Sequence, residues 1–191
     1  MLEIIRVRDY FKSKKEILGR IKRGLIFIYP TDTIYGIGCD STNYRAVARI
    51  RAAKKRDKKQ FSVIVPSKKW INENCIVNNL AGKWINKLPG AYTLILRLKN
   101  KKAVAKNVNL GSDKLGVRIP KNWSALIAKE INKPIISTSA NITNEPYMTG
   151  LRDLNPYVKE HVDLVIYEGV KRARPSKIVD LTGSKAVVIK R

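Results

Sequence analysis

The most informative stretch of this chain reads Tyr29-Pro30-Thr31-Asp32-Thr33-Ile34-Tyr35-Gly36-Ile37-Gly38-Cys39-Asp40. The apolar, aromatic run at residues 25–29 leads into it and has the length of a β-strand. Proline interrupts strand pairing, and the glycines let the following backbone turn sharply. We therefore predict a strand that ends in a loop rich in hydroxyl, carboxylate and phenol groups. In open α/β sheets, loops at the carboxyl ends of strands bind ligands, although a purely structural turn is the alternative.

Segments with helical and strand patterns alternate on both sides of this stretch, and strands predominate toward the carboxyl terminus. This order predicts a single α/β domain over residues 1–191, built on a twisted, mixed β-sheet flanked by helices. A turn is expected at Ser137-Thr138-Ser139-Ala140-Asn141. Helices are predicted at residues 9–22, 44–54, 67–70, 80–87 and 124–132, and strands at residues 2–7, 25–29, 61–65, 92–98, 115–119, 134–137, 162–167, 178–181 and 186–189. Asp9 or Ser13 is expected to cap the first of these helices, Asn43 the second and Ser67 the third.

The composition argues against several classes of protein. The two cysteines are too few for a disulfide framework or a zinc site, so no metal ligands are predicted. The single histidine, His161, makes a Ser-His or Cys-His nucleophile improbable. The sequence has no apolar run of about 18 residues and no signal-peptide pattern at its amino terminus. We therefore expect a reduced, cytoplasmic protein with no membrane partner.

The charge of the chain is extreme. Its 39 Lys and Arg residues against 15 Asp and Glu residues give a formal net charge of +24. Such a field attracts polyanions such as nucleic acids and nucleotide phosphates. The lysines are, however, spread over the whole chain, as a general compositional bias would produce. Charge alone therefore indicates tolerance of polyanions and does not identify a partner.

The common phosphate-binding signatures are missing, so a nucleotide would have to be held by separate cations and hydroxyls. Neither a P-loop nor a complete Rossmann glycine pattern is present. Lys54 and Arg56, just past a predicted helix, could clamp a triphosphate, or could merely complement the helix carboxyl terminus. Ser139 and Asn141 could bind phosphate oxygens, or could simply build their own turn.

Arg118 is the least expected residue of a predicted strand. It lies in the apolar run Leu115-Gly116-Val117-Arg118-Ile119-Pro120. A guanidinium between Val117 and Ile119 needs an anionic partner, because an unpaired charge is costly to bury. The sequence leaves open whether that partner is a carboxylate or phosphate of a ligand or a carboxylate of the protein itself.

These motifs occur in a fixed order along the chain. They are Pro30-Thr31-Asp32-Thr33-Ile34-Tyr35-Gly36-Ile37-Gly38, Lys54-x-Arg56, Leu88-Pro89-Gly90-Ala91-Tyr92-Thr93-Leu94, Gly116-Val117-Arg118-Ile119-Pro120, Ser139-x-Asn141 and Pro175-Ser176-Lys177-Ile178-Val179-Asp180-Leu181. The series closely resembles the YrdC/YciO family, whose hallmark is a tetrad of Lys-x-Arg and Ser-x-Asn. The resemblance runs from about residue 4 to Arg191 and implies a twisted α/β sheet with a large, basic cavity on one face.

The resemblance also implies an activity, the synthesis of L-threonylcarbamoyladenylate. A nucleotidyltransferase of this kind uses L-threonine, bicarbonate and ATP, with Mg²⁺ expected beside the ATP. A separate transferase complex then moves the threonylcarbamoyl group to tRNA. The implied ATP-phosphate residues are Lys54, Arg56, Ser139 and Asn141; the implied threonine residues are Thr31, Arg118 and Ser176, with Arg118 on the carboxylate; supporting residues are Thr33, Tyr35, Lys59, Thr93 and Ser137.

Several departures from the family pattern favour its YciO branch. Ile64-Val65 stands where some synthases have a histidine, Lys177 replaces a threonine, and Asn141 is followed by Ile-Thr-Asn-Glu where Ser-Gly is usual. One alternative is therefore a YciO-type protein that binds tRNA or double-stranded RNA with little or no synthase activity. Another is a carbamoyl-transfer module related to hydrogenase maturation factors, whose additional domains this sequence lacks.

Overall fold

The helices and strands follow the alternation that the sequence predicts. The structure is a computed structural model, and it describes residues 2–189. Its helices are α1 (Val7–Lys12), α2 (Lys14–Lys22), α3 (Tyr44–Ala53), α4 (Lys68–Asn74), α5 (Asn79–Ile85), α6 (Lys106–Asn109), α7 (Ala125–Ile131) and α8 (Pro156–Glu160), with a 3₁₀ turn η1 (Leu151–Asp153). Its strands are β1 (Glu3–Arg6), β2 (Phe27–Pro30), β3 (Tyr35–Gly38), β4 (Ser62–Ile64), β5 (Tyr92–Arg97), β6 (Lys114–Arg118), β7 (Ile135–Ser139), β8 (Leu164–Tyr167), β9 (Lys177–Asp180) and β10 (Val187–Ile189).

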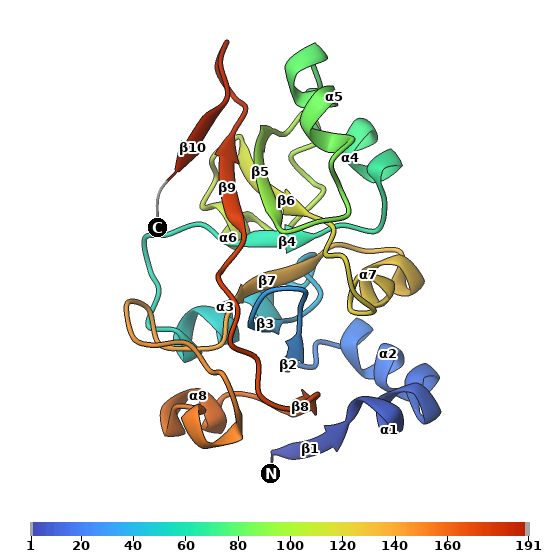
Figure 1. Cartoon of the computed structure of the whole chain (residues 1–191), viewed down its shortest axis with the longest axis vertical. Coiled ribbons are helices and arrows are strands. Elements are labelled where there is room, and N and C mark those ends of the chain that lie inside the picture. The colour runs from blue at the N-terminus through green and yellow to red at the C-terminus, as the bar shows by residue number, and fades with distance from the viewer. Residues whose placement is uncertain (1, 190–191) are drawn as a thin grey trace.

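The strands form one mixed sheet. Its order within the described residues is β1-β8-β2-β3-β7-β4-β6-β5-β9-β10. Strand β8 is parallel to β1 and β2, whereas β7 is antiparallel to both β3 and β4. In Figure 1, β7 lies between a lower group of strands, β1, β2, β3 and β8, and an upper group, β4, β5, β6, β9 and β10. The α/β class and the mixed sheet are therefore confirmed.

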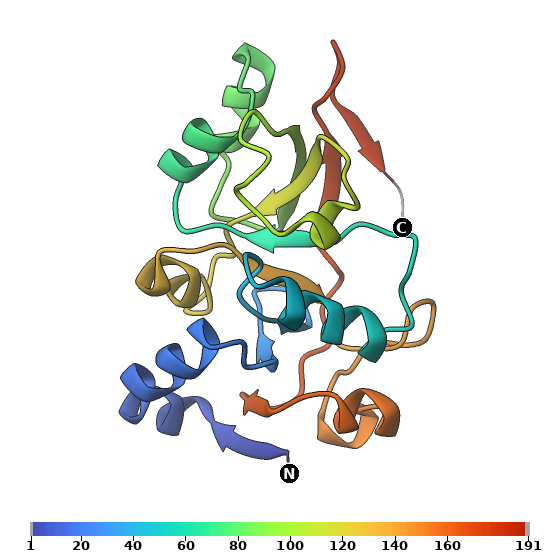
Figure 2. The same ribbon diagram turned by 180° about the vertical axis from the view of Figure 1, so that it is seen from behind.

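Helices pack on both faces of the sheet, which explains why its inner strands are apolar at consecutive positions. In β2, Ile28 faces one apolar cluster, and its neighbours Phe27 and Tyr29 face a second cluster on the opposite side. Residues of α1, α2 and α7 complete the second cluster. Residues of α3, α4, α5, α6 and α8 complete the first. Figure 2, seen from behind, shows the teal helix α3 in front of the sheet.

Helix starts were among the more accurate predictions. The side chain of Asn43 accepts a hydrogen bond from the amide of Ala46, and that of Ser67 accepts one from Trp70. Both therefore cap their helices as expected. The cap predicted at Asp9 or Ser13 is wrong: Asp9 lies inside α1, and Ser13, where the predicted helix divides into α1 and α2, makes no side-chain cap. The short helices α6 and α8 were not predicted, because each has too few residues to show a helical period.

Two corrections concern the strands nearest to the polar loops. The loop predicted after Tyr29 is only four residues long, at 31–34, and Tyr35–Gly38 returns as β3 beside β2. The turn predicted at residues 137–141 begins later, because Ser137 to Ser139 continue β7. In both cases polar and glycine residues suggested a loop, whereas pairing with a neighbouring strand supplied the backbone hydrogen bonds.

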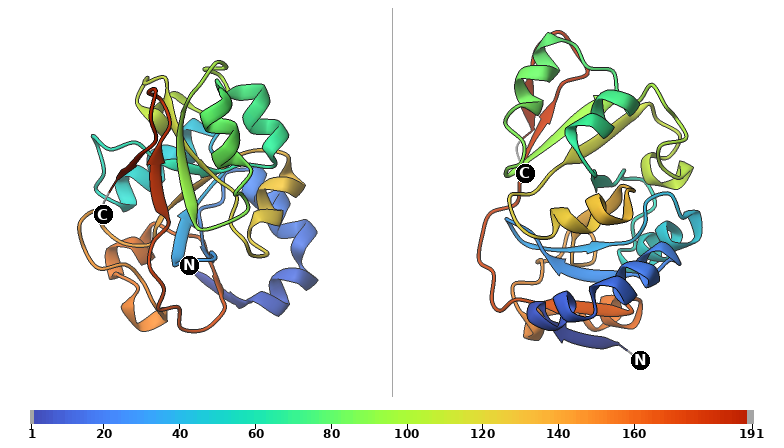
Figure 3. Two further views of the ribbon diagram at one scale, coloured as in Figure 1. Left: turned by 45° about the horizontal axis from the view of Figure 1, so that its top comes forward. Right: turned by 90° about the vertical axis from the view of Figure 1, so that its right-hand side faces the viewer.

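A segment that we call the strap, residues 168–176, joins β8 to β9. It passes in front of the middle of the sheet in Figure 1 and stands apart from it in the side view of Figure 3. The phenol of Tyr35 fastens its start, donating to the carbonyl of Gly169 at 2.7 Å and accepting from the amide of Glu168 at 2.9 Å. Tyr147 donates to the carbonyl of Ala173 at 3.2 Å. The strap therefore spans the two groups of strands.

The close contact between β3 and its neighbours gives a test of the fold. A Cβ atom at Gly38 would lie 2.6 Å from the carbonyl oxygen of Ile136 and 2.9 Å from Cε1 of Tyr29. We expect Gly38→Ala to lower the free energy of unfolding by about 1–3 kcal/mol, because neither neighbour can move away freely. Denaturant unfolding measures this change. Gly183→Ala is the control, since a Cβ there meets nothing within 4 Å; equal stability of the two variants would contradict the prediction.

Candidate active site

A cavity begins where one face of the sheet changes from apolar to hydroxyl-bearing side chains. Alternate residues of β7 on this face are Ile135, which belongs to the second apolar cluster, and then Ser137 and Ser139. Strand β4 changes in the same way, from Ile64 in that cluster to Ser62 at the cavity. The helices α1, α2 and α7 cover the apolar end of this face, and the cavity occupies the polar remainder.

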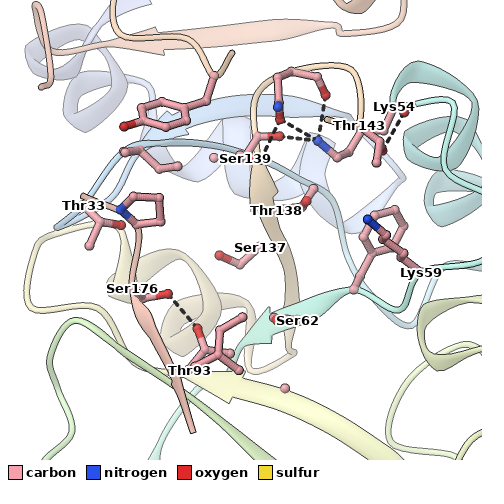
Figure 4. Close-up of a pocket in the computed structure, with 18 of the residues that line it drawn as sticks. Thr33, Lys54, Lys59, Ser62, Thr93, Ser137, Thr138, Ser139, Thr143 and Ser176 are labelled. Carbon is pink, nitrogen blue, oxygen red and sulfur yellow. Dashed lines mark hydrogen bonds between the residues drawn. The ribbon is translucent and has the colours of Figure 1, made fainter. Parts of the chain in front are cut away.

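The cavity measures about 860 Å³, and every site residue predicted from the sequence contributes to its lining. Among residues 2–189, its charged lining side chains are Lys54, Arg56, Lys59 and Arg118 against a single carboxylate, Glu145. Figure 4 shows hydroxyl groups from several strands around this space. The predicted residues brought together there are Thr31, Thr33, Tyr35, Lys54, Arg56, Lys59, Thr93, Arg118, Ser137, Ser139, Asn141 and Ser176.

Lys54 joins the end of α3 to the turn after β7. Its ammonium donates to the carbonyl of Ser139 at 2.6 Å, and to the carbonyl and side-chain oxygen of Asn141 at 2.7 and 3.0 Å. Ser139 Oγ donates to the same side-chain oxygen of Asn141 at 2.6 Å (Figure 4). Three members of the predicted tetrad are therefore one hydrogen-bonded unit, although Lys54 lies 85 and 87 residues from the other two in the chain.

This lysine is buried to an unusual degree, with 1% of its surface exposed. Burial, and then the nearby charge of Arg56, lower the pKa of Lys54 to about 7. The three oxygen acceptors oppose this shift, because they stabilise the ammonium form. An anion in the cavity would favour the charged form further, so the protonation of Lys54 responds to what the cavity holds.

Arg56 follows in the loop between α3 and β4. Its guanidinium donates to the carbonyl of Lys59 at 3.2 Å, to Thr138 Oγ1 at 3.4 Å and to the carbonyl of Gln60. It also lies 4.9 Å from the centre of the Phe61 ring. The loop therefore holds Arg56 in place.

Arg118 has a carboxylate partner within the protein. Its Nη2 donates to Asp32 Oδ1 at 2.6 Å, and the two side chains are only 7% and 10% exposed. The other carboxylate oxygen of Asp32 accepts from the amide of Lys121 at 2.9 Å. Among residues 2–189, Nε of Arg118 has no hydrogen-bond partner. The sequence left open whether the partner of Arg118 belongs to a ligand or to the protein, and the structure shows a carboxylate of the protein. A ligand can therefore bind only the guanidinium nitrogens that Asp32 does not use.

The predicted threonine-binding residues line the cavity and also maintain its walls. Thr31 Oγ1 lies 2.7 Å from the carbonyl of Ile34 and 2.9 Å from Thr33 Oγ1, so it closes the turn between β2 and β3. The hydroxyls of Ser176 and Thr93 lie 2.9 Å apart and link the strap to β5 (Figure 4). The roles of these residues toward a ligand stay predictions.

The sequence analysis missed several residues that line the cavity: Ser62, Thr138, Thr143, Asn144, Glu145 and Tyr147. Thr143 Oγ1 donates to the carbonyl of Lys54 at 2.9 Å, and Asn144 has a left-handed backbone with φ of 71°. Glycine and asparagine favour this conformation. Thr143-Asn144 thus provides a hydroxyl and a backbone turn, as the Ser-Gly usual at this place in the family would. This chemical similarity was the signal in the sequence that could have indicated Thr143 and Asn144.

Two observations concern metals and membranes. No group of three or more His, Cys, Asp or Glu side chains is suitably placed to hold a metal ion within residues 2–189. Over the same residues, no helix has the length and apolar character needed to cross a bilayer.

The fold and this cavity together define the class of protein. The chain belongs to the Sua5/YciO/YrdC family, because the family model, described as "Telomere recombination", matches residues 20–191. Among curated relatives, a Methanocaldococcus jannaschii protein named "Putative threonylcarbamoyl-AMP synthase" is 36% identical over an alignment of 181 residues, and the match covers 93% of this chain and 82% of the relative. The "Uncharacterized protein YciO" of Escherichia coli is 27% identical over an alignment of 175 residues, and the match covers 89% of this chain and 84% of the relative.

Solved structures agree with this assignment. A doubly substituted Sua5 from P. abyssi has a TM-score of 0.88 and 27% identity; the match covers all of this chain but only 60% of that Sua5 chain. A P. abyssi Sua5 complexed with L-threonine has a TM-score of 0.82 and 26% identity over 98% of this chain and 56% of the other. The E. coli YciO structure, with 24% identity and a TM-score of 0.85 over all of this chain and 95% of that one, shares the fold. The extent of the domain, residues 1–191, stays a prediction.

The Arg118–Asp32 pair gives a test of the site. We expect Asp32→Ala to lower the free energy of unfolding by about 3–5 kcal/mol, because it leaves the buried guanidinium without its partner. Denaturant unfolding measures the change. Glu73→Ala is the control: Glu73 lies 3.7 Å from Lys69 with both side chains mostly exposed, and such pairs contribute about 0–1 kcal/mol. An Asp32 variant as stable as the control would show that the pair has no structural role.

Proposed function

We propose that this chain is an L-threonylcarbamoyladenylate synthase. It converts L-threonine, bicarbonate and ATP to threonylcarbamoyl-AMP and pyrophosphate. One observation carries the proposal: two sets of residues line the same cavity of about 860 Å³. The residues around Lys54 and Arg56 are suited to bind phosphates, and Arg118 is suited to bind the carboxylate of an amino acid. Ligand pockets commonly measure roughly 300–1,000 Å³, so this space is large for one amino acid alone. Membership of the family and the threonine complex of a Sua5 relative support the same assignment.

The chemistry requires that two anions be brought together. The amine of threonine first combines with bicarbonate, with loss of water, to give a carbamate. A carbamate oxygen then attacks the α-phosphorus of ATP, a new P–O bond forms, and the bond to the β-phosphate oxygen breaks to release pyrophosphate. No covalent bond to the protein is needed. Fixed cations and hydrogen-bond donors lower the barrier, because they stabilise negative charge without reorganising during the reaction.

The cavity supplies such groups at fixed positions. Lys54, Arg56, Ser139 and Asn141 would hold the phosphates, and Lys59 stands beside them with its ammonium 3.4 Å from Asn144 Oδ1. Arg118, which also lines the cavity, would bind the threonine carboxylate through the nitrogens that Asp32 does not use. Thr31 and Ser176 would meet the rest of the amino acid, with Thr33, Tyr35, Thr93 and Ser137 shaping the wall.

Mg²⁺ fits the proposal as a companion of ATP. The described cavity wall has one carboxylate, Glu145, so it does not offer a ligand set of its own for the ion. Mg²⁺ is commonly bound through substrate phosphates and retained waters. When bound in that way it would supply further neutralisation of the phosphate charge. The adenylate would then pass to a separate threonylcarbamoyl transferase complex for tRNA modification, in the cytoplasm.

The direct test measures pyrophosphate release by the purified protein with ATP and Mg²⁺. We expect release only when both threonine and bicarbonate are present, and we expect threonylcarbamoyl-AMP in the products by mass spectrometry. Omitting threonine, or replacing it with valine, is the control. Pyrophosphate release at the same rate with and without threonine would overturn the assignment.

The net charge of +24 favours one other candidate, a YciO-type RNA-binding protein. Its affinity for tRNA or double-stranded RNA would be carried by phosphate contacts and would fall steeply as salt rises. The same assay separates the two: a synthase acts without RNA, whereas the RNA-binding candidate binds tRNA and releases no pyrophosphate. Obligatory stimulation by tRNA would also contradict the simple synthase.

Arg118→Lys tests which substrate this residue serves. The change keeps the charge but removes the planar, forked donors that can grip a carboxylate at two points. We expect the KM for threonine to rise about tenfold or more and the KM for ATP to change little, as the loss of one charge-assisted contact predicts. Steady-state kinetics below the unfolding range measure both constants. Equal increases would assign Arg118 to the phosphates or the fold.

The pKa of Lys54 predicts proton uptake when ATP binds. Because this pKa is lowered to about 7, most Lys54 side chains are neutral near pH 8 in the free protein. Phosphate charge raises the pKa, so binding draws a proton from the buffer near pH 8 but not near pH 6, where the ammonium is already formed. Calorimetry in two buffers of different ionisation enthalpy measures the uptake. Lys59→Met, which removes an exposed cation of the cavity, should retain the uptake; equal heats in both buffers for the unchanged protein would contradict the prediction.

A further inference from the structure

The loop at residues 54–60 presents three basic side chains to the cavity but has no helix or strand of its own. Its shape depends on one side chain in the last turn of α3. Arg51 Nη1 donates to the carbonyl of Arg56 at 2.7 Å, to that of Lys59 at 3.2 Å and, more weakly, to that of Asp57 at 3.5 Å. The loop backbone therefore wraps around a single guanidinium.

The other nitrogens of the same guanidinium hold a different element. Nε of Arg51 donates to the carbonyl of Asn107 at 2.6 Å, and Nη2 donates to that of Val108 at 3.3 Å. Both acceptors belong to α6, which packs beside α3. Arg51 thus anchors the loop to a helix, and it uses donors in several directions that a lysine ammonium could not reproduce.

Arg51 is also coupled to Arg56 through a shared aromatic ring. The guanidinium carbon of Arg51 lies 4.7 Å from the centre of the Phe61 ring, and that of Arg56 lies 4.9 Å from it. Phe61 is buried, and its amide donates to the carbonyl of Val108 at 2.9 Å. A change in the position of Arg51 therefore reaches Arg56 both through the ring and through the loop backbone.

We propose that Arg51 is a positioning residue for phosphate binding: it fixes the loop so that Arg56 and Lys59 face a polyphosphate in the cavity. The inference rests on the proposed function for the nature of the ligand, a nucleoside triphosphate. Arg51 does not line the cavity, so its effect is exerted through the loop. Small displacements of binding groups weaken a site strongly, which makes such support measurable.

The test measures binding of tripolyphosphate and of ATP by calorimetry, at a temperature where every variant is folded by circular dichroism. Arg51→Met removes all the donors, and Arg51→Lys keeps the charge but not the fork. Arg49→Met is the matched control: Arg49 is on the same helix and donates to Asp163 Oδ1 at 2.8 Å, on a different element. Trypsin cleavage after Lys58 and Lys59 reports on the loop directly.

We expect the Kd of Arg51→Met for both ligands to rise about tenfold or more, with faster cleavage in the loop. The lysine variant should be intermediate, and the Arg49 control should match the unchanged protein. If Arg51→Met is unfolded, Arg51→Lys decides the matter by the same measurements. Unchanged affinity in the folded Arg51 variant, or an equal loss in the Arg49 control, would overturn the inference.

The same data separate this inference from the proposed function. If the unchanged protein binds tripolyphosphate and Arg51→Met binds it weakly, the positioning role stands even when no threonine-dependent pyrophosphate release is found. If affinity is unchanged in Arg51→Met while release occurs, the synthase assignment stands and the positioning role fails. A protein that binds neither ATP nor tripolyphosphate would overturn both.

Discussion

The buried ammonium of Lys54 is the interaction on which the site depends. It ties the carboxyl end of α3 to the turn after β7, through the carbonyls of Ser139 and Asn141. The lysine is nearly inaccessible to water, so these oxygens must replace its hydration. The same contacts set the spacing of Lys54, Ser139 and Asn141. The protonation of the Lys54 amine in turn depends on whether an anion lies nearby. One side chain therefore links the stability of the cavity to its electrostatics.

The cavity lies where one face of the sheet changes from apolar to polar side chains. Along β7 the face changes from Ile135 to Ser137, and the covering helices stop where the hydroxyls begin. The strap spans the gap and is fastened by Tyr35 at its start and by Ser176 at its end. Because the cations are held by protein carbonyls and carboxylates before any ligand arrives, little reorganisation is needed on binding. Such preorganisation suits a reaction between two anions.

Much of the fold could be predicted locally, because strand and helix periods and caps such as Asn43 and Ser67 depend on neighbouring residues alone. The failures have a common cause. Strand β3 and the end of β7 have the polar and glycine content of loops, and only pairing with other strands makes them regular. Helices α6 and α8 are too short to show a helical period, although the side chain of Asn155 caps the start of α8.

For the site as well, the sequence predicted some features and the tertiary structure decided others. Side-chain chemistry and order along the chain were enough to select twelve of the residues that line the cavity and to indicate the family, since a hydroxyl or guanidinium keeps its chemistry wherever it lies. Partners were not predictable: the pairing of Arg118 with Asp32 joins residues 86 apart, and that of Lys54 with Asn141 joins residues 87 apart. The supporting role of Arg51 was invisible for the same reason. Such contacts form only when the sheet has brought distant strands together. A local sequence pattern cannot predict them, because the two partners are far apart in the chain.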